Sequence, residues 1–295
     1  MRPRRRRFPK PSHDNDLGAM QFRIRHESLY RYDVPVALGE HVLRLTPRAD
    51  GIRLRSHRLS VEPEPSRWCR ELDALGNALT RVSFFGSTQS LRVDSQIELE
   101  TLAPPALDFG LPPLPWQRVA GPREAWSPDG GSIAASVQAF AEALAQDVGY
   151  DPIPFLDHLT RTLFTRFDRH IRHTGAARSA AETLALGQGA CRDLTVLFLE
   201  ACRYCNIEGR FVSGYQAQAD TPDGQRHLHA WAEVSLPGAG WRGWDATHGL
   251  RVGEGHVALY AAATQGATMP IEGGFLFQGP VVNSTLDHSV RISTS

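Results

Sequence analysis

The sequence predicts an α+β protein, in which a β-sandwich-like N-terminal domain precedes a core where a helix-borne cysteine packs on an antiparallel sheet. Apolar residues alternate with polar ones through residues 20–103, which is typical of half-buried strands. After residue 133 the apolar residues recur every three or four positions, as in helices, and a second strand-rich stretch begins near residue 210. A chain of 295 residues is long enough for two such domains.

The bulk composition excludes several classes of protein. With 41% hydrophobic and 22% charged residues, and no run near the roughly 18 apolar residues of a membrane helix, we expect no membrane span. The 32 basic and 32 acidic residues cancel, so no overall positive charge favours nucleic acid as a specific partner. Nothing in the composition indicates an oligomeric state.

Residues 1–19 are expected to form a disordered basic leader. They hold six arginine or lysine residues against two aspartates, together with three prolines, and they lack the apolar segment of a secretory signal. A strand-like sequence begins at Met20, which makes Met20 an alternative translation start to Met1. Four cysteines without a secretory signal predict reduced thiols and a cytoplasmic location.

The first domain is expected over residues 20–103, where the alternation begins with Phe22 and Ile24. Residues 104–132 are rich in proline, and we interpret them as the connection between the domains. The catalytic domain is then expected over residues 133–290.

The helical part of the second domain is expected to contain four helices. Apolar faces over residues 137–144 and 155–163 predict two of them, and a capping-box sequence at Ser179 predicts a third that ends at Leu186. The fourth carries an apolar stripe of 3.6-residue period. The stripe comprises Leu194, Leu197, Phe198, Ala201, Cys202 and Cys205.

Cys191 is the candidate nucleophile. It follows a glycine-rich turn and precedes the apolar stripe by three residues, which places its sulfur at the N-terminus of the fourth helix. Unpaired N–H groups and the helix dipole stabilise an anion there, and with an imidazolium nearby they can lower a thiol pKa from about 8.5 by several units. The alternative is a small buried hydrophobic residue, but the position ahead of the stripe favours a nucleophile.

His229 and Asp245 are the candidate base and its orienting carboxylate. Residues 228–235 and the run that ends at Asp245 alternate as two strands of a hairpin turning at Pro237, which puts His229 and Asp245 opposite each other on one face. A slip of two residues would keep both on that face. His227 shares this face and is the main competitor for the base, and Asp245 has the alternative role of a strand-end cap.

Three further residues, Gln188, Gly189 and Trp231, are expected to line the substrate or oxyanion site. Gly189 would let a substrate backbone approach the sulfur, and Gln188 is a candidate hydrogen-bond donor beside the N–H of Cys191. Trp231 shares the face of His229.

No metal or cofactor is expected. Cys202 and Cys205 form a Cys-x-x-Cys pair, but a zinc site needs a second pair of ligands, and both residues lie on the apolar stripe. No dense acidic loop predicts a calcium site. We therefore assign both cysteines to the core.

At these residues the chain resembles the bacterial branch of the transglutaminase-like superfamily, which includes cysteine proteases. The matching text comprises Gly189-Ala190-Cys191-Arg192-Asp193, Arg203 through Gly214-Tyr215, His229-Ala230-Trp231, and Gly240-Trp241 through Trp244-Asp245-Ala246-Thr247. The N-terminal portion is similar to the domain that accompanies this branch. The resemblance implies a papain-like α+β core with Cys191 as nucleophile, His229 as base and Asp245 as the residue that orients it.

We therefore predict a cysteine-dependent acyl-transfer enzyme that acts on carboxamide or peptide bonds of a protein or peptide through a thioacyl intermediate. If an amine accepts the acyl group, the reaction is transamidation; if water accepts it, the enzyme is a cysteine protease or amidase. The sequence leaves both acceptors open. A catalytically silent binding or scaffolding protein is the alternative of another class, although all three triad residues are present.

Overall fold

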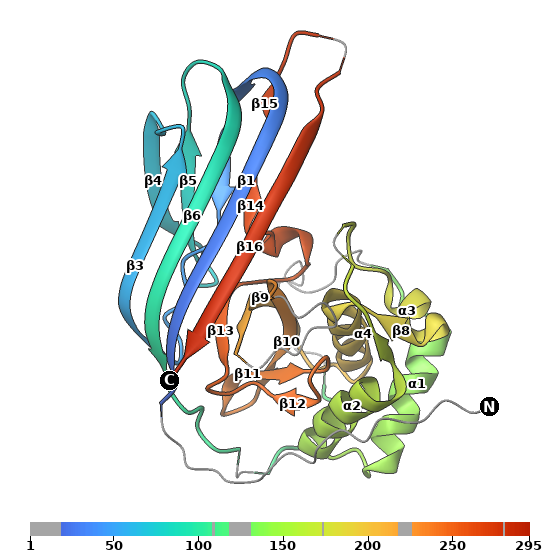
Figure 1. Ribbon diagram of the computed structural model, residues 1–295. Helices are drawn as coiled ribbons and strands as arrows, with labels where there is room; N and C mark the ends of the chain where they lie inside the picture. The colour runs from blue at the N-terminus through green and yellow to red at the C-terminus, as the bar shows by residue number, and fades with distance from the viewer. Residues whose placement is uncertain (1–18, 108–109, 118–130, 173, 218–225, 280) are drawn as a thin grey trace, which may run out of the picture.

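The computed structural model describes residues 19–107, 110–117, 131–172, 174–217, 226–279 and 281–295. The expected leader, apart from its last residue, lies outside these described residues, as does part of the expected connection. Figure 1 shows two sheets built mainly from residues 21–101, which we call the N-terminal β-layer, then a central sheet, and a group of helices on the other side of the central sheet. The predicted α+β fold class is confirmed.

The strands predicted for the N-terminal region are present. They are β1 (Gln21–Leu38), β2 (His41–Leu43), β3 (Ile52–Glu62), β4 (Arg67–Leu72), β5 (Ala78–Ser83) and β6 (Thr88–Thr101). β6 pairs with β1 and β3 in one sheet, whereas β5 pairs with β2 and β4 in another. Alternate side chains of β1, such as Phe22 and Ile24, share a buried cluster with Leu43 and Val82 of the second sheet, because period-2 alternation directs them to one face.

The C-terminal strands return to this N-terminal β-layer. They are β14 (Ile271–Glu272), β15 (Phe275–Leu276) and β16 (Ser284–Thr294). β16 runs antiparallel along β1, β15 pairs with the end of β1, and β14 pairs with β2. Strands from residues 271–294 therefore pair with strands of the N-terminal region, and the domain boundaries expected from the sequence stay a prediction. β16 is mostly exposed, so its sequence carries little alternation, and long-range backbone pairing with β1 defines it.

The central sheet and the helices form the rest of the molecule. The helices are α1 (Ala135–Asp147), α2 (Pro152–Arg166), α3 (Ala180–Leu186) and α4 (Cys191–Tyr204). The sheet has the order β12 (Leu250–Arg251), β11 (Gly240–Asp245), β10 (His229–Leu236), β9 (Gly209–Gln216) and β13 (His256–Ala262). A short parallel pair, β7 (Asp168–Arg169) and β8 (Gln188–Gly189), flanks α3, and a 3-10 turn, η2 (Gly266–Thr268), follows β13.

The sequence pattern places the helices correctly. The apolar stripe, which runs along α4 to its C-cap residue Cys205 and includes Cys202, is buried with α1, α2 and one face of β10, which confirms its assignment to the core. The capping box that begins at Ser179 is also confirmed, since Ser179 and Glu182 exchange side-chain and backbone hydrogen bonds at the start of α3.

Across the described part of the chain, no helix combines the length and the apolar content that crossing a membrane requires.

β10 and β11 form the predicted hairpin, with a register two residues from the expected one. Leu236 pairs with Gly240 and Ala232 pairs with Trp244, so His229 does not lie directly opposite Asp245. Because side chains alternate with a period of two, the shift leaves His229 and Asp245 on the same face. The two side chains meet along the diagonal between the strands, which is within reach of a histidine ring.

The N-terminal β-layer binds the edge strand β13 of the central sheet. Asn77 is fully buried; its amide donates to the carbonyl of Ala261 at 2.8 Å and accepts the N–H of the same residue at 2.9 Å. Arg48 donates its backbone N–H to the carbonyl of Ala258 at 2.9 Å. These bonds satisfy backbone groups that an open sheet edge would otherwise leave unpaired.

Replacing Asn77 by alanine is expected to lower the free energy of unfolding by about 2–4 kcal/mol, because both backbone groups of Ala261 would lose their partner in a buried place. Urea unfolding followed by tryptophan fluorescence measures the change. The control is Asn283→Ala, which removes an exposed asparagine bonded to Asp33 and should cost less than about 0.5 kcal/mol. Equal stabilities of the two variants would contradict the prediction.

Candidate active site

Cys191 is the first residue of α4, at the position that the sequence predicts. Ala190 precedes it in an extended conformation, and the Asp193 carboxylate accepts the N–H of Ala190 at 2.9 Å. Asp193 is fully buried, and its other oxygen accepts the backbone N–H of Arg178 at 2.8 Å and the guanidinium of Arg172 at 2.6 Å. These bonds tie the loop before α3 to the start of α4, and so hold the Cys191 sulfur at the positive end of the helix.

The structural role of Asp193 was not predicted, although an acidic residue in the first helical turn is a recognisable capping signal. Asp193 also explains why residue 189 is a glycine, because a Cβ at Gly189 would lie 2.9 Å from the Cβ of Asp193. Close packing against Asp193 therefore requires the glycine. Gln188 pairs with Asp168 in the β7–β8 pair. That Gln188 and Gly189 also contact substrate stays a prediction.

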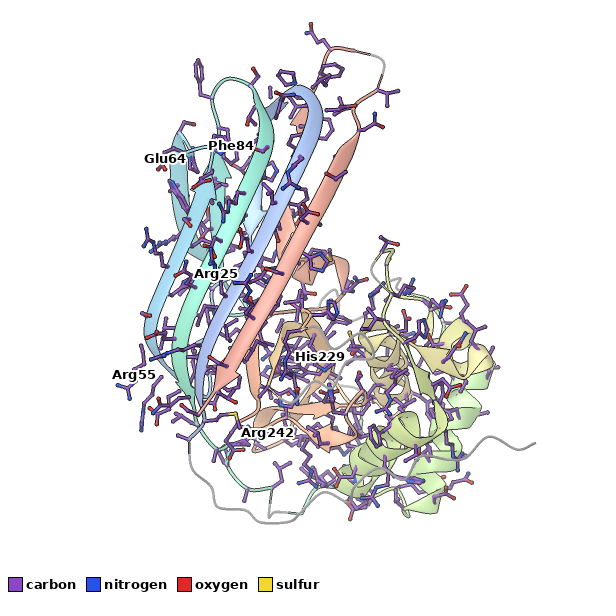
Figure 2. All side chains as sticks on the ribbon, in the orientation of Figure 1. Arg25, Arg55, Glu64, Phe84, His229 and Arg242 are labelled. Carbon is purple, nitrogen blue, oxygen red and sulfur yellow. The ribbon has the colours of Figure 1, made fainter. Side chains whose placement is uncertain are left out.

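His229 is the first residue of β10 and lies between Cys191 and Asp245. Its Nε2 is 2.8 Å from Oδ2 of Asp245, which leaves Nδ1 for its other hydrogen-bond partner, the thiol of Cys191. The backbone N–H of Ala230 also donates to the Cys191 sulfur. Figure 2 places His229 between the N-terminal β-layer and the helices. The structure thus brings together the three residues that the sequence singles out as a triad.

The structure also distinguishes His229 from its competitor. The ring of His227 lies two residues earlier, with its centroid 6.2 Å from that of His288 on β16. The short contact with Asp245 is made by His229. This geometry favours His229 as the base.

Trp231 is buried beneath the triad. A Cβ at Gly214 would lie 2.5 Å from the indole ring, so Gly214 gives this large side chain its space. The ring packs edge-on against His256, with 5.2 Å between centroids. With only 1% of its surface exposed, Trp231 packs in the core beneath the site, and the expectation that it contacts substrate stays a prediction.

Asp245 ends β11 and is surrounded by more donors than a triad requires. Besides His229, its Oδ2 lies 2.7 Å from Nδ1 of His248 and 3.1 Å from Nε2 of His256. Its Oδ1 accepts the backbone N–H groups of Thr247 at 2.9 Å and His248 at 3.2 Å. Neither histidine was predicted. His248 stands three residues after Asp245, a spacing that could have revealed it, whereas His256 belongs to a different strand and has no local signal.

Burial and pairing act in opposite directions on the pKa values of the triad. Burial raises the pKa of the Cys191 thiol, but the hydrogen bond and the charge of His229 outweigh this and leave that pKa below its ordinary value. Burial lowers the pKa of His229, but Asp245 and Cys191 raise it, to about 10. Burial likewise opposes ionisation of Asp245, yet the histidines hold its pKa well below the usual range. The pairing therefore favours a thiolate and an imidazolium at neutral pH.

Two histidines and one carboxylate at this site are a ligand set that transition metals can use. One potential ligand atom from each of His229, Asp245 and His248 lies within 4.8 Å of the others. In the structure these nitrogen atoms lie 2.7–2.8 Å from Oδ2 of Asp245, which is the distance of N–H···O hydrogen bonds. Hydrogen bonding thus accounts for the arrangement. The expectation that the protein needs no metal or cofactor stays a prediction.

The ion pair predicts that iodoacetamide alkylates Cys191 at neutral pH much faster than the partly exposed Cys69. The pKa of Cys191 is lowered, whereas the hydrogen bond to Glu71 raises the pKa of Cys69. Alkylation of Cys191 should slow as the pH falls through its pKa and the thiolate takes up a proton. Any reaction in which His229 donates its proton should slow as the pH rises through about 10. Peptide mass spectrometry at stepped pH follows both thiols, and equal alkylation rates at pH 7 would contradict the ion pair.

Comparison with known families finds matches to both halves of the chain. The family model of the bacterial transglutaminase-like N-terminal region matches residues 22–100, and that of the transglutaminase-like superfamily matches residues 136–246. The uncharacterised protein ML0607 of Mycobacterium leprae is 24% identical over 273 residues, which span 88% of this chain and 94% of the relative. The crystal structure of a proposed cysteine protease from Cytophaga hutchinsonii superposes with a TM-score of 0.65 at 15% identity, over 94% of this chain and 91% of that one. At this identity the likeness shows a shared fold.

Proposed function

Because the chain belongs to the transglutaminase-like superfamily, in its bacterial branch, we propose that it is a cysteine-dependent acyl-transfer enzyme acting on carboxamide or peptide bonds. The observation that carries this proposal is the connected arrangement of Cys191, His229 and Asp245 at the start of α4. A silent scaffold would have no need of a buried thiol paired with an imidazole and a carboxylate.

The proposed reaction has two halves. The Cys191 thiolate adds to the carbonyl carbon of the donor, and the carbon–nitrogen bond then breaks as His229 gives its proton to the departing ammonia or amine. The product of this half is a thioacyl enzyme. A second nucleophile then adds to the thioester, its proton passes to His229, and the carbon–sulfur bond breaks to regenerate the thiolate.

The start of α4 supports the same chemistry. The N–H of Cys191 belongs to the first helical residue, so it has no acceptor within the helix and can donate to the oxyanion that forms at the carbonyl. Asp245 holds the His229 ring through Nε2 and stabilises its positive charge, but it does not need to take the proton itself.

The nucleophile that accepts the acyl group from the thioacyl enzyme determines which of two reactions the enzyme catalyses. An amine acceptor makes the enzyme a transamidase, and water makes it a protease or amidase. We propose a protein or peptide as the donor in either case. The cytoplasmic location predicted from the cysteines stays a prediction.

Incubation with glutamine-containing peptides, with and without a primary amine, tests the proposal. Ammonia release with a peptide–amine adduct identifies transamidation, and ammonia release or chain cleavage without an adduct identifies hydrolysis. A thioacyl adduct on the peptide that contains Cys191 is expected in rapidly quenched samples. Absence of turnover and of any adduct across the peptide set would reject the acyl-transfer function.

A further inference from the structure

The Asp245 carboxylate makes a third histidine contact that the triad does not use. His256 is buried, and its Nε2 lies 3.1 Å from the same oxygen that His229 approaches at 2.8 Å. A carboxylate offers about four lone-pair positions, so several donors can bind it at once. Each donor restricts how the carboxylate can rotate, and a rotation would move the oxygen away from His229.

The surroundings of His256 determine which ring nitrogen carries the proton. The backbone N–H of Gly253 donates to Nδ1 at 3.4 Å, so Nδ1 acts as the acceptor and Nε2 carries the hydrogen toward Asp245. Burial lowers the pKa of His256, which favours the neutral ring. The charged or titratable groups that Asp245 meets from the packed elements are His229, His248 and His256, with the Arg169 guanidinium nearby. Among the three histidine rings that contact Asp245, the ring of His256 belongs to β13.

The N-terminal β-layer fixes the segment that carries His256. Thr101, the last residue of β6, donates its hydroxyl to the carbonyl of Glu254 at 2.7 Å, two residues before His256. Arg48 binds the carbonyl of Ala258, two residues after His256. The N-terminal layer thus holds the chain on both sides of this histidine.

We propose that His256 is a positioning residue for the catalytic carboxylate, and that the N-terminal β-layer acts on the active site through it. His256 holds Oδ2 of Asp245 in line with Nε2 of His229, and the bond from Thr101 holds His256 in place. The inference rests on the proposed Cys191 chemistry and gives the N-terminal layer a role in it.

The test compares His256→Gln with His256→Asn. The glutamine amide nitrogen can reach the position of Nε2, whereas the asparagine amide is one methylene shorter. We expect His256→Gln to stay within about threefold of wild type in the alkylation rate of Cys191 at pH 7, and His256→Asn to fall roughly tenfold or more. In turnover, His256→Asn should lower kcat and leave KM unchanged, since His256 is buried and acts through Asp245.

Two further variants complete the experiment. His158→Asn, at a partly exposed histidine bonded to Asp147, should leave the alkylation rate unchanged. Thr101→Val, which keeps the shape of the side chain but removes its hydroxyl, should slow alkylation several-fold. Equal rates for His256→Gln and His256→Asn would overturn the positioning role, and an unchanged rate in Thr101→Val would overturn the action of the N-terminal layer. Alkylation needs no substrate, so these outcomes are distinct from a failure of wild type to turn over any donor.

Discussion

Replacing Cys191 by alanine is expected to reduce acyl transfer by roughly 10⁴-fold or more, the largest effect of any single substitution in this chain. The variant lacks the atom that forms the thioacyl bond, so no other group of the site can carry the first half of the reaction. His229 and Asp245 would keep their contact, since it does not depend on the sulfur. The measurement is the initial rate of ammonia or amine release from the best peptide donor.

Cys69→Ala is the matched control, because Cys69 is a thiol in the β-layer, bonded to Glu71 rather than to the triad. It should retain wild-type turnover. Equal activity in Cys191→Ala and wild type would reject the mechanism, and loss of activity in Cys69→Ala alone would move the chemistry to a different thiol.

Replacing Asp245 by asparagine is expected to reduce kcat by roughly 10³–10⁴-fold, comparable to the same change in serine protease triads. Three imidazole rings converge on this carboxylate. An asparagine offers one carbonyl and an NH₂ group that is a donor, so the NH₂ would face either the three rings at the Oδ2 position or the backbone N–H groups of Thr247 and His248 at the Oδ1 position. The pKa of His229 would fall as well, because the charge of Asp245 raises it.

Asp157→Asn makes the same chemical change outside the site, at a carboxylate that binds Trp244 and Arg251, and should leave kcat within a few-fold of wild type. Stability provides a second measurement. The folded-state pKa of Asp245 is depressed, so its contribution to stability is present above the unfolded pKa of about 3.9 and is lost as the pH falls below it. Acidification should therefore destabilise wild type more than Asp245→Asn. The opposite order would contradict the depressed pKa.

The sequence was most informative where local periodicity determines the structure. The stripe of α4 placed Cys191 at the helix start, and alternation on the hairpin placed His229 and Asp245 on one face. The two-residue error in the register arose because turn geometry, which fixes strand pairing, was inferred from Pro237 alone. A shift of two residues does not change which side of the hairpin a side chain lies on. The predicted common face of His229 and Asp245 was therefore correct, although the predicted residue pairing was not.

Features that depend on distant parts of the chain could not be predicted. His256 meets Asp245 only because β13 joins the central sheet beside β9, and no pattern near His256 specifies that position. A Cβ at Gly189 would lie 2.9 Å from the Cβ of Asp193, and no local pattern in the sequence indicates this close packing. In both cases the missing information was a contact between side chains that are brought together by the fold.

The pairing of β16 with β1 has a consequence for how the protein is made. Gln21 and Ser295 exchange backbone hydrogen bonds, so the first and last described strands are neighbours. At about 5–20 residues per second, a ribosome needs roughly ten to sixty seconds between releasing β1 and releasing β16. During that time the edge of β1 has no native partner and can pair with another nascent chain. We expect the nascent N-terminal layer to depend on chaperones until translation delivers the strand that closes it.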